Sequence, residues 1–431
     1  MSKFRRVMCF LLSVVAFACL LPVPGAAQEI ALASEAAVLM DAESGQILYG
    51  KNMDSAMYPA SITKVLTGLL ALKYGKETDK VTMTQAGVSQ VPRTSSHIAL
   101  EPGEAFTMKD ALYALALVSA NDAAVAIAET VSGSVEDFAK LMNEEAEKLG
   151  AYNSHFVNPN GMPNQDHYTT ARDMALITAE ALKQEGFLTY FGAKSYEMPA
   201  TNLSAPRSLV SKNQFIDGTF DCPGLLMSKT GWTSSAQGTF AAVVRKGDVT
   251  LVAVTLKSPL LEDKYRDTHQ LMDYGFSHYS RVKVTGEQVV GSLELGAFTP
   301  AANQELSYLI PAGESVDDIS FALEPLDWEG EKRERVKVAV YASIGELRLP
   351  DGELTLTQPH KERGEAFTLS ELLQGRPVQI EDLPPAVRTL IVIALIVLLA
   401  VFLLWLKRQI QRHRRRRHLK ARIKRMKKRM E

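Results

Sequence analysis

The stretch Tyr58-Pro59-Ala60-Ser61-Ile62-Thr63-Lys64-Val65-Leu66 places a serine and a lysine three residues apart at the head of an apolar run. Residues i and i+3 of a helix share one face, so the Lys64 amine can reach the Ser61 hydroxyl. If the site lowers the pKa of that amine, Lys64 can accept the hydroxyl proton and make Ser61 a nucleophile. The stretch therefore predicts a helix that begins at or just before Ser61 and carries a candidate catalytic pair.

The same spacing also occurs in Ser280-Arg281-Val282-Lys283, but no apolar helical pattern follows it. Taken alone, Ser61 is better explained as a helix cap and Lys64 as a solvated lysine in the first turn. The four-residue pattern therefore carries little weight without further motifs.

Two further motifs follow at a distance along the chain. They are Ser119-Ala120-Asn121 and Lys229-Thr230-Gly231, in the order and approximate spacing of serine penicillin-recognising enzymes. Ser211-Lys212-Asn213 repeats the Ser-x-Asn pattern, whereas Lys-Thr/Ser-Gly occurs once in the sequence. The three ordered motifs together favour an enzyme over unrelated caps and turns.

Hydrophobic periodicity predicts strands at both ends of the region around these motifs and helices between them. The expected strands are 36–40, 46–50, 239–244 and 249–256, and the expected helices after the one at Ser61 are 108–117, 122–131, 135–149 and 171–183. Strands from both ends of the region would form one sheet, with the helices packed on it.

From about Arg281 the pattern changes to short strands separated by turn residues. The expected strands are 282–284, 305–309, 320–323, 336–341, 346–349 and 353–357. This pattern predicts a small β-rich domain over residues 281–373. Proline and glycine residues mark a linker over 374–388.

Both ends of the chain carry apolar segments. Residues 1–27 combine an early basic cluster, an apolar stretch and small residues at the end, as in a cleaved signal peptide. Residues 389–406 are an apolar run that spans about 27 Å as a helix, close to the thickness of a bilayer core. Fourteen of residues 407–431 are Lys or Arg, so the positive-inside rule predicts a cytoplasmic tail that associates with lipid.

The segment between the signal and the transmembrane helix is acidic. Residues 28–388 hold 31 basic and 48 acidic residues, a formal charge of about −17, and this balance argues against a nucleic-acid partner. Cys222 is the one cysteine outside the signal, and the histidines show no metal-ligand spacing. We expect no disulfide, metal or other cofactor.

These motifs resemble those of the low-molecular-mass penicillin-binding proteins, in particular the serine-type D-alanyl-D-alanine carboxypeptidases. Two further strings support the resemblance, Ala42-Glu43-Ser44-Gly45-Gln46-Ile47-Leu48-Tyr49 and Asn158-Pro159-Asn160-Gly161-Met162. The resemblance implies a β-lactamase/transpeptidase-like α/β (α+β) catalytic domain over 28–280, followed by the small β domain and a C-terminal transmembrane helix. Met162 and Gln237 depart from the residues that many relatives carry.

The resemblance also implies a role for each motif residue. Ser61 would be the nucleophile, Lys64 the general base and Ser119 a proton relay to the leaving amine. The substrate would be bound by the remaining motif residues, namely Asn121, Lys229, Thr230, Gly231 and Trp232. The backbone N–H groups of Ser61 and Trp232 would bind the oxyanion.

The implied activity is removal of the terminal D-alanine from peptidoglycan stem peptides that end in D-Ala-D-Ala, with β-lactams as covalent inhibitors. The topology implies a single-pass membrane protein with its catalytic domain outside the cytoplasm. Three alternatives stay open: a D,D-endopeptidase, a β-lactamase of the same fold, and a catalytically silent wall-binding scaffold.

Overall fold

The computed structural model describes residues 30–293, 298–329 and 335–357. One sheet has five antiparallel strands in the order β2-β1-β9-β8-β7. The strands are β1 (Ala36–Asp41), β2 (Ile47–Lys51), β7 (Leu225–Thr233), β8 (Gln237–Lys246) and β9 (Val249–Ser258). The N-terminal hairpin thus pairs with the later strands, and the prediction of one sheet from both ends of the region is confirmed.

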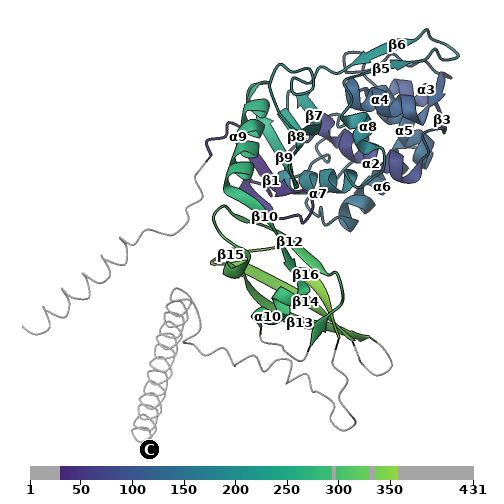
Figure 1. Cartoon of the computed structure of the whole chain (residues 1–431). Helices are drawn as coiled ribbons and strands as arrows, with labels where there is room; N and C mark the ends of the chain where they lie inside the picture. The colour runs from purple at the N-terminus through teal and green to yellow at the C-terminus, as the bar shows by residue number, and fades with distance from the viewer. Residues whose placement is uncertain (1–29, 294–297, 330–334, 358–431) are drawn as a thin grey trace, which may run out of the picture. The chain divides into compact units, whose positions relative to one another are not determined.

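Helices cover both faces of this sheet (Figure 1). One face packs against α9 (Asp263–His278), and the other against a group of helices from the middle of the chain. This group comprises α2 (Lys64–Tyr74), α3 (Gln85–Ser89), α4 (Met108–Leu117), α5 (Asn121–Ser132), α6 (Val135–Lys148), α7 (Ala171–Ala181) and α8 (Phe187–Phe191).

The alternation of side chains along β1 shows how the sheet serves two cores. Val38 and Met40 belong to the core under the helix group, whereas Ala37 and Leu39 belong to the core under α9. Successive strand residues point to opposite faces, so a fully buried strand lies in the middle of three layers. This arrangement holds β7, the last strand of the sheet, beside the start of α2.

Two short hairpins extend the helical part. β3 (Lys80–Thr82) pairs with β4 (Ala105–Thr107), and β5 (Ser195–Met198) pairs with β6 (Arg207–Val210). The predicted helices of the middle region are confirmed, but α3, α8, α9 and both hairpins were not predicted. The helix expected at Ser61 begins with a 3₁₀ turn, η1 (Ala60–Thr63), that leads into α2.

The residues after α9 form smaller sheets, as the short strands predicted. β10 (Tyr279–Thr285) pairs with β12 (Glu305–Pro311). A second sheet has the order β11-β16-β14-β13, with β15 paired to β14. The remaining elements are α10 (Gly286–Ser292), β11 (Thr299–Pro300), η2 (Val316–Asp318), β13 (Ser320–Glu329), β14 (Arg335–Ile344), β15 (Leu347–Arg348) and β16 (Gly352–Thr357).

The β-rich part contacts the N-terminal hairpin through buried polar groups. Arg281 of β10 forms an ion pair of 2.6 Å with Asp41 at the end of β1, and both side chains are almost fully buried. The Gln46 side chain donates to the Leu309 carbonyl oxygen at 2.8 Å and accepts the Leu309 N–H at 3.2 Å. The Ala42–Tyr49 string, noted above for its resemblance, thus includes a residue that contacts β12.

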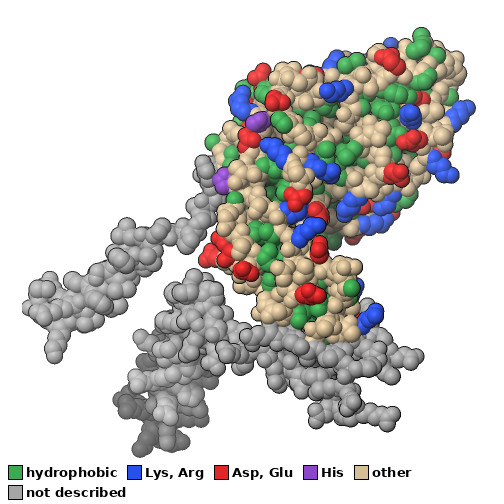
Figure 2. All heavy atoms as spheres, viewed as in Figure 1, with side chains coloured by type: hydrophobic (Ala, Val, Ile, Leu, Met, Phe, Trp, Pro, Cys, Tyr) green, Lys and Arg blue, Asp and Glu red, His purple; other side chains and the backbone are tan. Residues whose placement is uncertain are grey.

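Among the described residues, no helix has the length and hydropathy that a membrane crossing requires. The predicted signal peptide (1–27), linker (374–388), transmembrane helix (389–406) and tail (407–431) lie outside the described residues. On the face shown in Figure 2, acidic and basic side chains are interspersed over the described part of the chain.

Candidate active site

Ser61 lies in the 3₁₀ turn η1, and Lys64 is the first residue of α2. The Lys64 Nζ atom is 3.1 Å from the Ser61 Oγ atom, as the i, i+3 spacing predicted. Nζ also donates to the Asn121 Oδ1 atom and to the Asn160 carbonyl oxygen, each at 2.6 Å. The Lys64 side chain is completely buried. The amine is therefore fixed beside the hydroxyl and shielded from water.

The surroundings of Lys64 disfavour its charged form. Burial lowers the pKa of Lys64 well below its ordinary value, the positive charge of Lys229 lowers it further, and the Asp122 carboxylate acts in the opposite direction. A buried amine beside another cation loses its proton more readily than a solvated one. Lys64 is thus better suited than an ordinary lysine to accept the Ser61 proton.

The second motif lies at the start of α5. Ser119 has a positive φ of 58°, and Asn121 is the first residue of that helix. The Asn121 N–H donates to the Ser96 carbonyl oxygen at 2.8 Å. The buried Asp122 carboxylate accepts the N–H groups of Ile98 and Leu100. The motif is therefore bonded to the loop that runs from Ser95 to Glu104.

The third motif lies on β7, the edge strand of the sheet. The Lys229 Nζ atom is 2.8 Å from the Ser119 Oγ atom, which joins the second and third motifs. Burial lowers the pKa of Lys229 to about 7, and the nearby Lys264 contributes in the same direction. Thr230 is half-buried beside it. The Lys229 amine, which loses its proton more readily than an ordinary lysine, therefore lies beside the Ser119 hydroxyl.

Gly231 brings the strand close to the nucleophile turn. A Cβ atom at this position would lie 2.2 Å from the Thr239 Oγ1 atom and 2.8 Å from the Ser61 nitrogen. Only a residue without a side chain allows β7 to approach the Ser61 backbone N–H this closely. The next residue, Trp232, exposes 59% of its surface at the edge of the site.

Comparison with known sequences identifies the family to which this site belongs. The family described as D-alanyl-D-alanine carboxypeptidase matches residues 24–259, more than half of the chain. The chain belongs to the D-alanyl-D-alanine carboxypeptidase family. The resemblance inferred from the motifs is confirmed.

Individual relatives of this family agree with the assignment. The D-alanyl-D-alanine carboxypeptidase DacF of Bacillus subtilis is 33% identical over 69% of this chain and 78% of its own length. DacC of Escherichia coli is 33% identical over 57% of this chain and 62% of its own length.

Solved structures show the same fold. Penicillin binding protein 5 of Haemophilus influenzae matches with a TM-score of 0.62 at 23% identity, over 77% of this chain and 98% of that protein. A D-alanyl-D-alanine carboxypeptidase of Mycobacterium tuberculosis matches with a TM-score of 0.54 at 28% identity, over 59% of this chain and 94% of that protein. The mixed α/β penicillin-binding fold predicted for the catalytic region is confirmed.

Residues of the Asn158–Met162 string, to which the sequence assigned no catalytic role, also support the carboxypeptidase site. The Asn160 carbonyl oxygen is one of the acceptors for Lys64, and Gly161 packs against the nucleophile turn. Gly161 has a φ of 80°, and a Cβ atom there would lie 1.9 Å from the Ala60 carbonyl oxygen. The Asn158 side chain accepts the Gly161 N–H at 2.7 Å, so Asn158 stabilises the turn that holds Gly161.

His167 is a further residue near the site that the sequence motifs did not predict. Its Nε2 atom is 2.9 Å from the Thr63 Oγ1 atom, and its Nδ1 atom accepts the Val157 N–H at 3.1 Å. Burial, followed by the charges of His155 and Lys64, lowers the pKa of His167 to about 3. The ring is therefore neutral with its proton on Nε2, which donates to Thr63. His167 thus joins the Asn160 loop to the nucleophile turn without contacting Ser61.

The two repeated patterns do not contain the Ser61–Lys64 pair or the Ser119–Lys229 contact. Ser280 and Lys283 are on strand β10, and Ser211-Lys212-Asn213 lies between β6 and β7. Within the described ranges, no group of three His, Cys, Asp or Glu side chains is arranged to hold a metal ion. Cys222 is a free thiol whose pKa is raised to about 11 by burial.

Proposed function

We propose that this protein is a serine-type D-alanyl-D-alanine carboxypeptidase that removes the terminal D-alanine from peptidoglycan stem peptides. The observation that carries the proposal is the buried Lys64 amine 3.1 Å from the Ser61 hydroxyl. The family of the chain supplies the substrate class, since its relatives are named for this activity.

The first step forms the acyl-enzyme. Lys64 takes the Ser61 proton as the Ser61 oxygen bonds to the carbonyl carbon between the two D-alanines. The resulting oxyanion accepts hydrogen bonds from the backbone N–H groups of Ser61 and Trp232, and each such donor contributes roughly 3 kcal/mol in comparable sites. The carbon–nitrogen bond then breaks, and the proton reaches the leaving amine through the Ser119 hydroxyl.

The second step restores the enzyme. Water attacks the ester carbonyl carbon, the bond to the Ser61 oxygen breaks, and Ser61 regains its proton while the shortened peptide leaves as a carboxylate. Lys64 is suited to take the proton of that water, because it lies beside the ester oxygen. A β-lactam would form the same ester and act as a covalent inhibitor.

The terminal carboxylate of the substrate would lie against Lys229 and Thr230. A carboxylate at this position raises the proton affinity of the Lys229 amine and pairs with the resulting ammonium group. Asn121 would bind the substrate backbone, and Gly231 would let the substrate approach β7. Because the catalytic groups are all present and joined by hydrogen bonds, the arrangement favours a catalyst over a silent scaffold.

The location of the enzyme is a further part of the proposal. A signal peptide over 1–27 would export residues 28–388, and a helix over 389–406 would anchor them with the basic tail in the cytoplasm. The lipid would bind the helix and tail, and no nucleic-acid partner is expected. Protease added outside intact cells should spare residues after Lys407, and cleavage there would refute this topology.

Fluorescent penicillin and a D-Ala-D-Ala peptide test the activity together. The full-length protein in detergent should be labelled covalently and should release D-alanine, whereas a Ser61→Ala variant should do neither. If the wild-type protein is folded but stays unlabelled and releases no D-alanine, the proposed function is wrong.

A further inference from the structure

A large open cavity lies on the leaving-group side of the site. Its volume is about 640 Å³. It is lined by Ser119, the proposed proton relay, and by Lys229 and Thr230, which are proposed to face the terminal carboxylate. Pockets of this size enclose drug-sized ligands. The methyl side chain of a leaving D-alanine fills only a small part of such a space.

The two walls of the cavity come from distant parts of the chain. One wall is the loop from Ser95 to Ala99, and the other is strand β6 with the segment Ser211–Asn213. The first wall is hydrogen-bonded to the second motif and its neighbour, because the Asp122 carboxylate accepts the Ile98 N–H and the Ser96 carbonyl oxygen accepts the Asn121 N–H.

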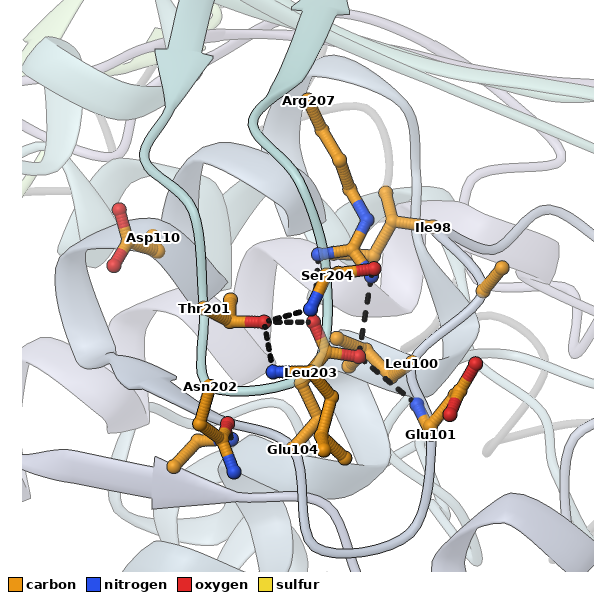
Figure 3. Close-up of polar contacts among 12 residues, drawn as sticks. Ile98, Leu100, Glu101, Glu104, Asp110, Thr201, Asn202, Leu203, Ser204 and Arg207 are labelled. Carbon is orange, nitrogen blue, oxygen red and sulfur yellow. Dashed lines mark hydrogen bonds and ion pairs between the residues drawn. The ribbon is translucent and has the colours of Figure 1, made fainter.

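An ion pair joins β6 to Glu104, at the end of the loop whose first residues form the other wall (Figure 3). The Arg207 guanidinium of β6 donates to both carboxylate oxygens of Glu104, at 2.7 and 3.1 Å. Glu104 also accepts from the Thr201 hydroxyl at 2.8 Å and from the Glu101 N–H at 3.0 Å. Bidentate pairs of this kind fix geometry as well as charge. The cavity is therefore a preformed space between a strand and a loop that are bonded to each other.

The charged side chains that line the cavity are all basic. Its described lining includes Arg207, Lys212 and Lys229 but no aspartate or glutamate. Arg207 is neutralised by Glu104, and Lys229 lies against Ser119. Lys212 is exposed, and within the described residues it has no ion-pair partner. An unpaired cation at the rim of a polar cavity favours an anionic group in the ligand.

We propose that this cavity binds the side chain of the leaving D-amino acid, and that the enzyme accepts terminal D-amino acids with long anionic side chains in place of D-alanine. This inference rests on the proposed function, because the same acyl transfer to Ser61 releases the larger amino acid as the free amine. It also gives the D,D-endopeptidase alternative a structural basis, since the leaving group at a cross-link is a D-centred amine whose side chain continues into a second peptide.

A series of peptides tests the proposal on the full-length enzyme. The peptides have the form diacetyl-L-lysyl-D-alanyl-D-X, where X is alanine, 2-aminoadipate, norleucine or lysine. We expect kcat/KM for D-2-aminoadipate to be comparable to that for D-alanine and at least about tenfold above that for D-lysine, because the two long side chains differ mainly in charge. D-Norleucine should fall between them.

Two variants, each with a control variant, test whether the long side chains bind in this cavity. Lys212→Glu should lower the ratio of kcat/KM for D-2-aminoadipate over D-lysine by about tenfold or more, whereas Lys140→Glu, on the exposed face of α6, should leave that ratio unchanged. Ser208→Trp, which narrows the cavity from β6, should lower kcat/KM for every long side chain relative to D-alanine. Ser235→Trp, an exposed serine outside the cavity lining, should leave the relative values unchanged.

The outcomes separate this inference from the function on which it rests. Cleavage of the D-alanine peptide alone, or equal cleavage of D-lysine and D-2-aminoadipate, would overturn the inference and leave the carboxypeptidase intact. Loss of cleavage of all four peptides by the folded enzyme would overturn both. Penicillin labelling of each variant verifies that its site is folded.

Discussion

Two stretches of this chain have the same Ser-x-x-Lys pattern and different structures. Ser61 and Lys64 lie on a 3₁₀ turn that enters a helix, and their side chains meet at 3.1 Å in a buried site. Ser280 and Lys283 lie on β10, where residues three apart point to opposite faces. The Lys283 side chain is 66% exposed and pairs with Glu305 at 3.7 Å. The backbone conformation, rather than the spacing, makes one pair a candidate catalyst.

The largest expected difference between the two stretches is in covalent labelling. Ser61→Ala removes the atom that forms the acyl-enzyme, so hydrolysis of the D-Ala-D-Ala peptide should fall by about 10⁶-fold, as for nucleophile knock-outs in serine proteases. Ser280→Ala should leave labelling and turnover unchanged. Equal labelling of the two variants would place the nucleophile elsewhere.

The two lysines should differ next. Lys64→Met keeps the length of the side chain but removes the base, so the acylation rate should fall by about 10²- to 10⁴-fold. Lys283→Met changes only an exposed charge and should have no measurable effect on acylation. Stopped-flow measurement of acylation by a chromogenic cephalosporin compares them, and a wild-type rate for Lys64→Met would exclude this lysine as the base.

Two histidine variants test whether a contact from outside the motifs holds the nucleophile turn in place. In the first stretch, Thr63 is hydrogen-bonded to His167. His167→Ala removes the donor to Thr63 and loosens the nucleophile turn, so acylation should slow by roughly 10²-fold, as when catalytic groups are misplaced by about 1 Å. His155→Ala, which changes a half-buried histidine on the same loop, serves as the control. His167→Gln should recover part of the rate because its amide also donates, and full activity of His167→Ala would refute the positioning role.

The smallest expected effect is a shift in pH dependence. Lys64 is active when neutral, so acylation rises with pH as this amine loses its proton. Lys229→Gln removes a positive charge that lowers the pKa of Lys64. The pKa should therefore rise, and the ascending limb of the acylation profile should move to higher pH. A limb that stays in place or moves to lower pH would contradict this coupling.

The sequence alone predicted the parts of the structure whose sequence pattern is local and strongly periodic. The helices α4, α5, α6 and α7 combine regular apolar spacing with clear ends, and α4 begins with the Thr107–Asp110 capping box. The three motifs predicted the residues that meet around Ser61, since each is short and carries its own chemistry. The roles assigned to all of these motif residues remain predictions.

Other features had no local signal. Helix α9 buries Lys264 and Asp267, residues usually found on a surface, so its inner face does not form an apolar stripe. Asp267 is buried because it accepts the N–H groups of Ala33 and Ser34, more than two hundred residues away. His167 likewise acts on Thr63 across a long separation in sequence. Such partners are fixed by tertiary packing, which periodicity does not describe.

The burial of Lys64 also has a thermodynamic consequence. In the unfolded chain this amine is solvated and protonated at neutral pH, whereas the folded site disfavours the proton. The unfolded state therefore binds more protons, and this group adds to the free energy of unfolding as pH rises from the folded-state pKa toward the unfolded-state pKa. Below that range the buried charge works against folding. The same arrangement that gives Ser61 its base thus makes the protein less stable in acid than it would be with an uncharged residue at that position.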